Sequence, residues 1–188
     1  LVACAAGVLR ELSIDGKRLK AWYLCDLKVD RKYALEKLPG KLFKKNLISN
    51  YLKCGHGYGV SMNPARGRNR VVKLIERFPW LPVRFAATLN FYSFDQAAAL
   101  EFHSSLSEKL GGISYLSLEG KKDLIMRSTG KRLPLFHIQH GANAAAGFES
   151  PKFEGTYMIC ATEGSELAGY LETRFAVSAT ASVVAHRM

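Results

Sequence analysis

The last third of the sequence constrains the fold most strongly, because its pattern changes twice within about thirty residues. Tyr157, Ile159 and Ala161 stand at every second position, which predicts a strand with one covered face. Ser165 is placed to cap a helix, in which apolar residues then recur three and four positions apart. Small and β-branched residues over 178–187 predict a closing strand. This stretch is therefore predicted to be strand, helix and strand.

A comparable series of elements precedes it. Residues 83–91 alternate in the manner of a strand, with Arg84 and Asn90 on the wetter face. Ser93 and the glutamine three positions later form a capping-box pattern, so a helix is predicted to begin there and to end at the glycine pair 111–112. An extended segment follows from 113 and is predicted to continue to 138.

Residues 83–187 thus give the order β-α-β-β-α-β. This order predicts an α+β fold, the ferredoxin-like sandwich, in which two helices cover one face of an antiparallel sheet. Many activities occur on that fold, so the order of elements alone does not define a function.

Charge divides the chain into two parts. Residues 1–80 hold 17 Lys or Arg against 6 Asp or Glu, whereas residues 81–188 hold 10 of each kind. We therefore expect a basic, largely irregular N-terminal extension over 1–80 and a folded domain over 81–188, with the boundary in the proline-flanked stretch 79–82.

A basic extension with interleaved aromatic residues favours RNA as its partner, since cations neutralise phosphates and rings stack on unpaired bases. A solvated basic surface and an arm that meets acidic lipid are the alternatives. The densest basic runs supply the predicted phosphate contacts, which are Lys44, Lys45, Arg66, Arg68 and Arg70.

Two segments carry a resemblance to a known family. The run Gly130–Ile138, with its basic pair, leucines and aromatic residue, resembles the second strand of the bacterial-type ribosomal protein S-six family, and residues 155–175 resemble its end. The resemblance implies a ferredoxin-like domain on the small-subunit platform. It also implies pairing with ribosomal protein S-eighteen, contact with small-subunit ribosomal RNA, and roles in RNA binding for Lys131 and Arg132. The extension and the start at Leu1 suggest a processed mitochondrial member.

Cysteine and histidine spacing gives little support for a metal. The four cysteines form no Cys-x-x-Cys pair, so partly buried, reduced thiols are expected. His137 and His140 are three apart in a predicted strand and should point to opposite faces. Cys54 with His56, or Cys160 with a neighbouring protein, stays open as a ligand set. No metal site and no cofactor are predicted.

No catalytic constellation is visible in the sequence, no run reaches the length of a membrane span, and no membrane partner is expected. The predicted function is therefore a non-enzymatic one: a structural constituent of the mitochondrial small ribosomal subunit. The alternative is a free-standing RNA-binding regulator with the same fold. Its sheet would stack bases on Phe85, Phe91 and Tyr157.

Overall fold

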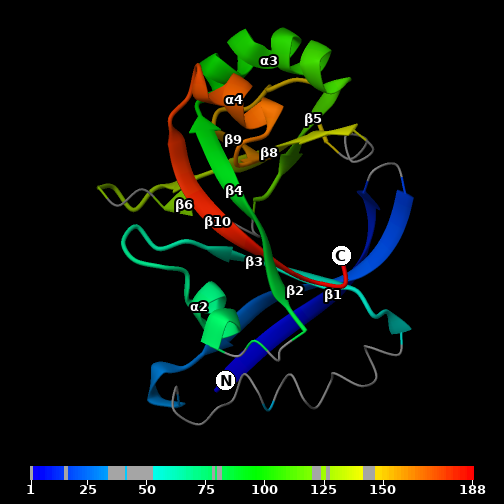
Figure 1. Ribbon diagram of the computed structural model, residues 1–188. Coiled ribbons are helices and arrows are strands. Elements are labelled where there is room, and N and C mark those ends of the chain that lie inside the picture. The colour runs from blue at the N-terminus through cyan, green and yellow to red at the C-terminus, as the bar shows by residue number, and fades with distance from the viewer. Residues whose placement is uncertain are drawn as a thin grey trace. The chain divides into compact units, whose positions relative to one another are not determined.

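The computed structural model describes residues 2–14, 17–33, 41, 53–77, 79, 82–119, 124–125, 128–141 and 147–188. Its elements are β1 (Ala3–Ile14), β2 (Lys17–Val29), η1 (Arg31–Tyr33), β3 (Gly57–Met62), α2 (Arg70–Arg77), β4 (Arg84–Phe94), α3 (Gln96–Leu110), β5 (Ile113–Ser117), β6 (Leu124–Ile125), β7 (Arg132–Leu133), β8 (Leu135–His140), β9 (Thr156–Thr162), α4 (Glu166–Glu172) and β10 (Val177–His186). Eight strands form one mixed sheet in the order β1-β2-β3-β10-β4-β9-β8-β5, and β6 pairs with β7 (Figure 1).

The chain forms two compact units, one of residues 1–88 with 181–188 and one of residues 89–180. In the second unit, α3 and α4 cover the same face of the sheet (Figure 1). The core beneath them contains the largest fully buried side chains of this unit, among them Tyr92, Tyr115, Tyr157, Ile159 and Leu171. Burial of such apolar and aromatic surface is the main source of stability in this unit.

The helices of the second unit begin and end at specific caps. The Ser165 side chain accepts a hydrogen bond from the backbone of Ala168 and caps α4, as the sequence predicted. The prediction that Ser93 caps α3 was wrong. β4 continues through Phe94, so the cap is Asp95, whose carboxylate accepts from the Ala98 N–H at 2.9 Å. Gly111 ends α3 with a φ of 71°, which glycine adopts without strain.

The ferredoxin-like prediction was wrong because the sequence between 113 and 138 holds two sheet strands rather than one. β5 pairs antiparallel with β8, from Ile113 opposite His140 to Ser117 opposite Phe136. β8 then runs parallel to β9, whereas a ferredoxin-like sheet is antiparallel throughout. Alternation shows that a segment is extended, but it does not show where the chain reverses.

The prediction of a largely irregular N-terminal extension was also wrong. β1 and β2 form a long antiparallel hairpin, and β3 pairs with β2 in parallel and with β10 in antiparallel register. Lys17, Arg18 and Lys20 occupy exposed positions of β2. A strand with an open face can carry many cations on it, so charge density did not indicate irregular structure here.

The sequence predicted that Asn90 lies on the solvent-exposed face of β4. In the second half of the strand, this face is the buried one. Asn90, Tyr92 and Phe94 lie beneath the helices. Both Asn90 and Tyr92 donate hydrogen bonds to the carboxylate of Glu172, at 3.1 and 3.0 Å. The paired amide is therefore tolerated in the core. Tyr157 is also fully buried, so it cannot stack bases as the regulator alternative required.

Asn69 organises the segment between β3 and α2. Its Nδ2 donates to Ser61 O and Asn63 Oδ1, and its Oδ1 accepts from the Val71 N–H at 2.8 Å. The side chain is 5% exposed, so these bonds replace water. The Ser182 hydroxyl also donates a hydrogen bond to Asn63 Oδ1.

We expect Asn69→Ala to lower the free energy of unfolding by about 2–3 kcal/mol, because it removes a helix cap and leaves buried carbonyls unpaired. Asn69→Asp keeps the cap acceptor but sets a carboxylate oxygen against the Ser61 and Asn63 oxygens, so it should also be destabilising. Urea unfolding followed by circular dichroism would measure both. Equal stability of Asn69→Ala and wild type would contradict this role for the side chain.

Candidate active site between β8 and β9

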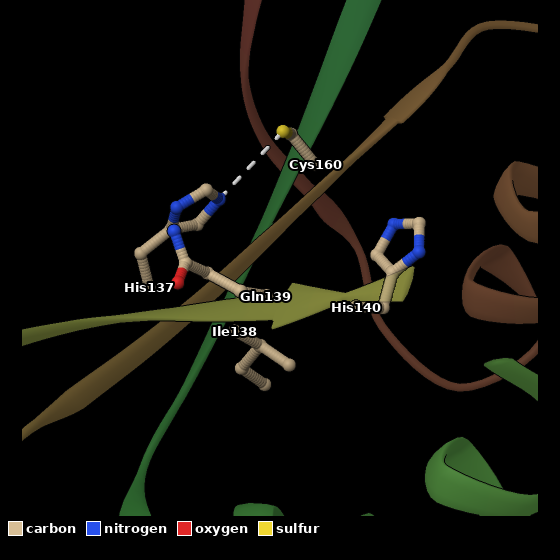
Figure 2. Close-up of a pocket in the computed structure, with 5 residues that line it drawn as sticks. All are labelled: His137, Ile138, Gln139, His140 and Cys160. Atoms are coloured by element: carbon tan, nitrogen blue, oxygen red, sulfur yellow. Dashed lines mark hydrogen bonds between the residues drawn. The ribbon is translucent and has the colours of Figure 1, made fainter. Parts of the chain in front are cut away.

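Two parallel strands of the second unit separate before they end. The β8–β9 ladder contains three pairs, from Leu135 opposite Thr156 to His137 opposite Met158. Past that point, β8 continues to His140 against β5, and β9 continues to Thr162 against β4. Figure 2 shows the two ribbons diverging there. Backbone N–H and C=O groups on the facing edges are thus turned into an opening.

A pocket of about 150 Å³ lies at this opening. Its lining residues are His137, Ile138, Gln139 and His140 from β8, with Cys160 from β9. His137, Gln139 and Cys160 point to one side of the sheet, while Ile138 points to the other, into the core (Figure 2). The sequence argument set His137 and His140 on opposite faces, yet both line the pocket because it lies at the strand's end.

Cys160 and His137 form a thiol–imidazole pair. Cys160 Sγ lies 3.9 Å from His137 Nε2, within reach of a weak sulfur hydrogen bond. Burial raises the pKa of the Cys160 thiol, so it stays protonated at neutral pH. An imidazole beside a protonated thiol can accept its proton as the sulfur attacks an electrophile.

Polar atoms beside this pair lack protein partners. Gln139 Oε1 is buried and has no hydrogen-bond partner within the described part of the chain, and the same is true of Ser114 Oγ. Ser114 lies directly opposite Gln139 in the β5–β8 ladder, which places both side chains on the same face. Buried polar groups are nearly always paired, so the unpaired Gln139 Oε1, which belongs to the pocket lining, points to a molecule that the pocket receives. Ser114 does not line the pocket, and its Oγ lies against Gly147.

The predicted phosphate contacts lie elsewhere. Lys44 and Lys45 fall outside the described residues. Arg66 and Arg68 are exposed between β3 and α2, Arg68 pairs with Glu76, and Arg70 begins α2. The three arginines therefore lie within one short segment that leads into α2.

The remaining two basic residues belong to the second unit. Lys131 is exposed just before β7, and Arg132 is the first residue of that strand. The role of all these cations as phosphate contacts stays a prediction.

The histidines and cysteines form no cluster of three possible metal ligands anywhere in the described ranges. Cys4, Cys25, Cys54 and Cys160 are half-buried, and none of them forms a disulfide in the described part of the chain. Among the described residues, no helix is long and apolar enough to cross a membrane.

No protein-family model matches the sequence, and no curated protein is significantly similar to it. Solved structures do match in fold. The N-myristoyltransferase of Saccharomyces cerevisiae with bound myristoyl-CoA has a TM-score of 0.51 at 7% identity, covering 98% of this chain and 66% of that one. The chain therefore shares its fold with this N-myristoyltransferase structure.

Two further structures match less closely. A protein described as a putative acetyltransferase, from Thermoplasma acidophilum, has a TM-score of 0.47 at 9% identity, covering 97% of this chain and 74% of that one. The GCN5-related N-acetyltransferase of Kribbella flavida has a TM-score of 0.41 at 11% identity, covering 98% and 56%.

The mixed sheet with its parallel β8–β9 pair, and the match in fold to the N-myristoyltransferase, overturn the resemblance to ribosomal protein S-six. The predicted ribosomal function and the partner ribosomal protein S-eighteen are corrected with it. The non-enzymatic assignment, drawn from the absence of a visible catalytic constellation, and the ribosomal RNA partner, drawn also from the basic charge, are corrected as well. The short motif Gly130–Ile138 misled because it matched a strand sequence without fixing that strand's neighbours, and β8 has a parallel neighbour. The mitochondrial location stays a prediction.

Proposed function

We propose that the chain is an acyltransferase that takes its acyl group from a thioester of coenzyme A. The observation that carries the proposal is the opening between β8 and β9, where two parallel strands part around an imidazole, a thiol and a carboxamide. The likeness in fold to a protein solved with myristoyl-CoA supports this class of donor.

The opening suits the shape of such a donor. The pantetheine arm of coenzyme A is extended and contains amide groups, so it can lie between the strands and bond to the edges that no longer pair with each other. The orphaned Gln139 Oε1 offers an acceptor for an amide N–H of that arm. The thioester would then lie near the sulfur and imidazole of the Cys160–His137 pair.

Two histidines are available for proton transfer at the pocket. An amine or thiol that accepts an acyl group must lose a proton, and imidazole is the side chain most often used to take it near neutral pH. His137 lies beside the thiol, and His140 is exposed at the mouth of the same pocket. Either ring can therefore serve the acceptor.

The proposal is tested by binding and turnover with defined donors. We expect coenzyme A, acetyl-CoA and myristoyl-CoA to bind the full chain saturably in calorimetry, and coenzyme A to be released faster when lysine-containing peptides are added. His137→Ala should slow release by about a hundredfold or more, as loss of a general base does. His103→Gln, on α3, is the matched control and should leave the rate unchanged. Failure of all three compounds to bind at millimolar concentration would overturn the proposal.

A further inference from the structure

The Cys160–His137 pair links β8 to β9 at the end of their ladder, where the two strands stop pairing with each other. The two side chains leave the same face of the sheet and point toward each other (Figure 2). Sulfur and ring nitrogen are brought to 3.9 Å by the parallel register, which sets His137 opposite Met158, two residues before Cys160.

We infer that Cys160 itself receives the acyl group, as a thioester intermediate, with His137 as the base; this inference rests on the proposed function. Cys160 Sγ attacks the carbonyl carbon of the acyl-CoA thioester, a bond forms between Sγ and that carbon, and the bond from carbon to the coenzyme A sulfur breaks. The Sγ proton passes to His137 Nε2 and then to the departing sulfur. One thioester replaces another, so no oxidant or reductant is needed.

The surroundings of the sulfur suit such a step. A thiol with a raised pKa gives a thiolate that is intrinsically a strong nucleophile, and here the thiolate forms only as the neighbouring imidazole takes the proton. A rotation of the Gln139 carboxamide would turn its NH₂ toward the carbonyl oxygen, where negative charge develops during attack.

Acyl transfer to the protein can be measured directly. The full chain is incubated with acetyl-CoA at neutral pH, quenched in acid, and analysed by intact-mass spectrometry with peptide mapping. We expect one acetyl group, on Cys160, that neutral hydroxylamine removes. Cys160→Ala should carry none, and His137→Ala should acquire it about a hundredfold more slowly or worse. Cys25→Ala, which removes another half-buried cysteine, is the matched control and should behave as wild type.

The outcomes separate this inference from the proposed function. Acetyl groups spread evenly over the four cysteines, or a rate that is indifferent to His137→Ala, would show ordinary chemical acylation and overturn the inference. Acyl transfer to peptides that is as fast in Cys160→Ala as in wild type would also overturn it, while leaving the acyltransferase proposal standing. Failure to bind coenzyme A or its thioesters would overturn both.

Discussion

Gly147→Ala is expected to lower the free energy of unfolding by about 3 kcal/mol, at the upper end of the usual cost of overpacking. A Cβ at this position would lie 2.7 Å from the carbonyl carbon of Tyr115 and 2.8 Å from both Tyr115 N and Ser114 Oγ. Backbone atoms of a paired strand cannot move aside as a flexible side chain can. The substitution should also break the two backbone hydrogen bonds between Tyr115 and Phe148, of 2.9 and 3.0 Å.

Gly169→Ala provides the matched control for this change. Gly169 lies within α4, and a Cβ there would meet nothing within 4 Å. Alanine is a better helix former than glycine, so this variant should gain about 0.5–1 kcal/mol. Urea unfolding of both variants would measure the difference. Wild-type stability of Gly147→Ala would show that the segment at 147–148 does not approach β5 closely.

Alkaline pH is expected to remove about 3 kcal/mol of stability through Tyr115 alone. Burial, with Tyr157 nearby, raises the pKa of Tyr115 from its ordinary value of 10.0 to about 12. Below about pH 10 the phenol is neutral in both the folded and the unfolded chain, and its contribution is fully present. As the pH rises from about 10 to 12, the unfolded chain loses this proton and the folded chain holds it, so stability falls.

Tyr115→Phe isolates this contribution from that of the other tyrosines. The variant loses the 2.9 Å hydrogen bond between the phenol and His103 Nδ1, so it should be less stable than wild type at pH 9. The gap between the two proteins should narrow as the pH approaches 12, in urea titrations at each pH. A gap that stays constant with pH would show that Tyr115 ionises equally in both states.

The elements that could be predicted from sequence are those whose signals are local. The alternation at 157–161 correctly predicted β9, and the cap at Ser165 correctly predicted the start of α4. Both signals depend only on residues a few positions apart in the sequence. The sheet neighbours could not be predicted in this way. The parallel pairing of β8 with β9 joins residues 21 positions apart, and no motif in either segment encodes it.

The candidate site was partly visible in the sequence and was not recognised as one site. His137 and His140 were considered as metal ligands, and Cys160 as a metal ligand or a partly buried thiol. Their meeting depends on the parallel register, which brings a histidine of one strand to a cysteine of the next. Gln139 was not predicted as a site residue, because nothing in the sequence indicates that its side-chain oxygen is buried without a hydrogen-bond partner in the described part of the chain.

The pairing of β3 with β10 has a consequence for synthesis of the chain. Ser182 of β10 bonds to Asn63 at the end of β3, and the two are 119 positions apart. At roughly 5–20 residues per second, β3 would wait on the order of ten seconds for this partner after leaving the ribosome. During that interval one of its edges is open to pairing with other nascent chains. Expression with a chaperone that holds extended segments should therefore raise the yield of native protein.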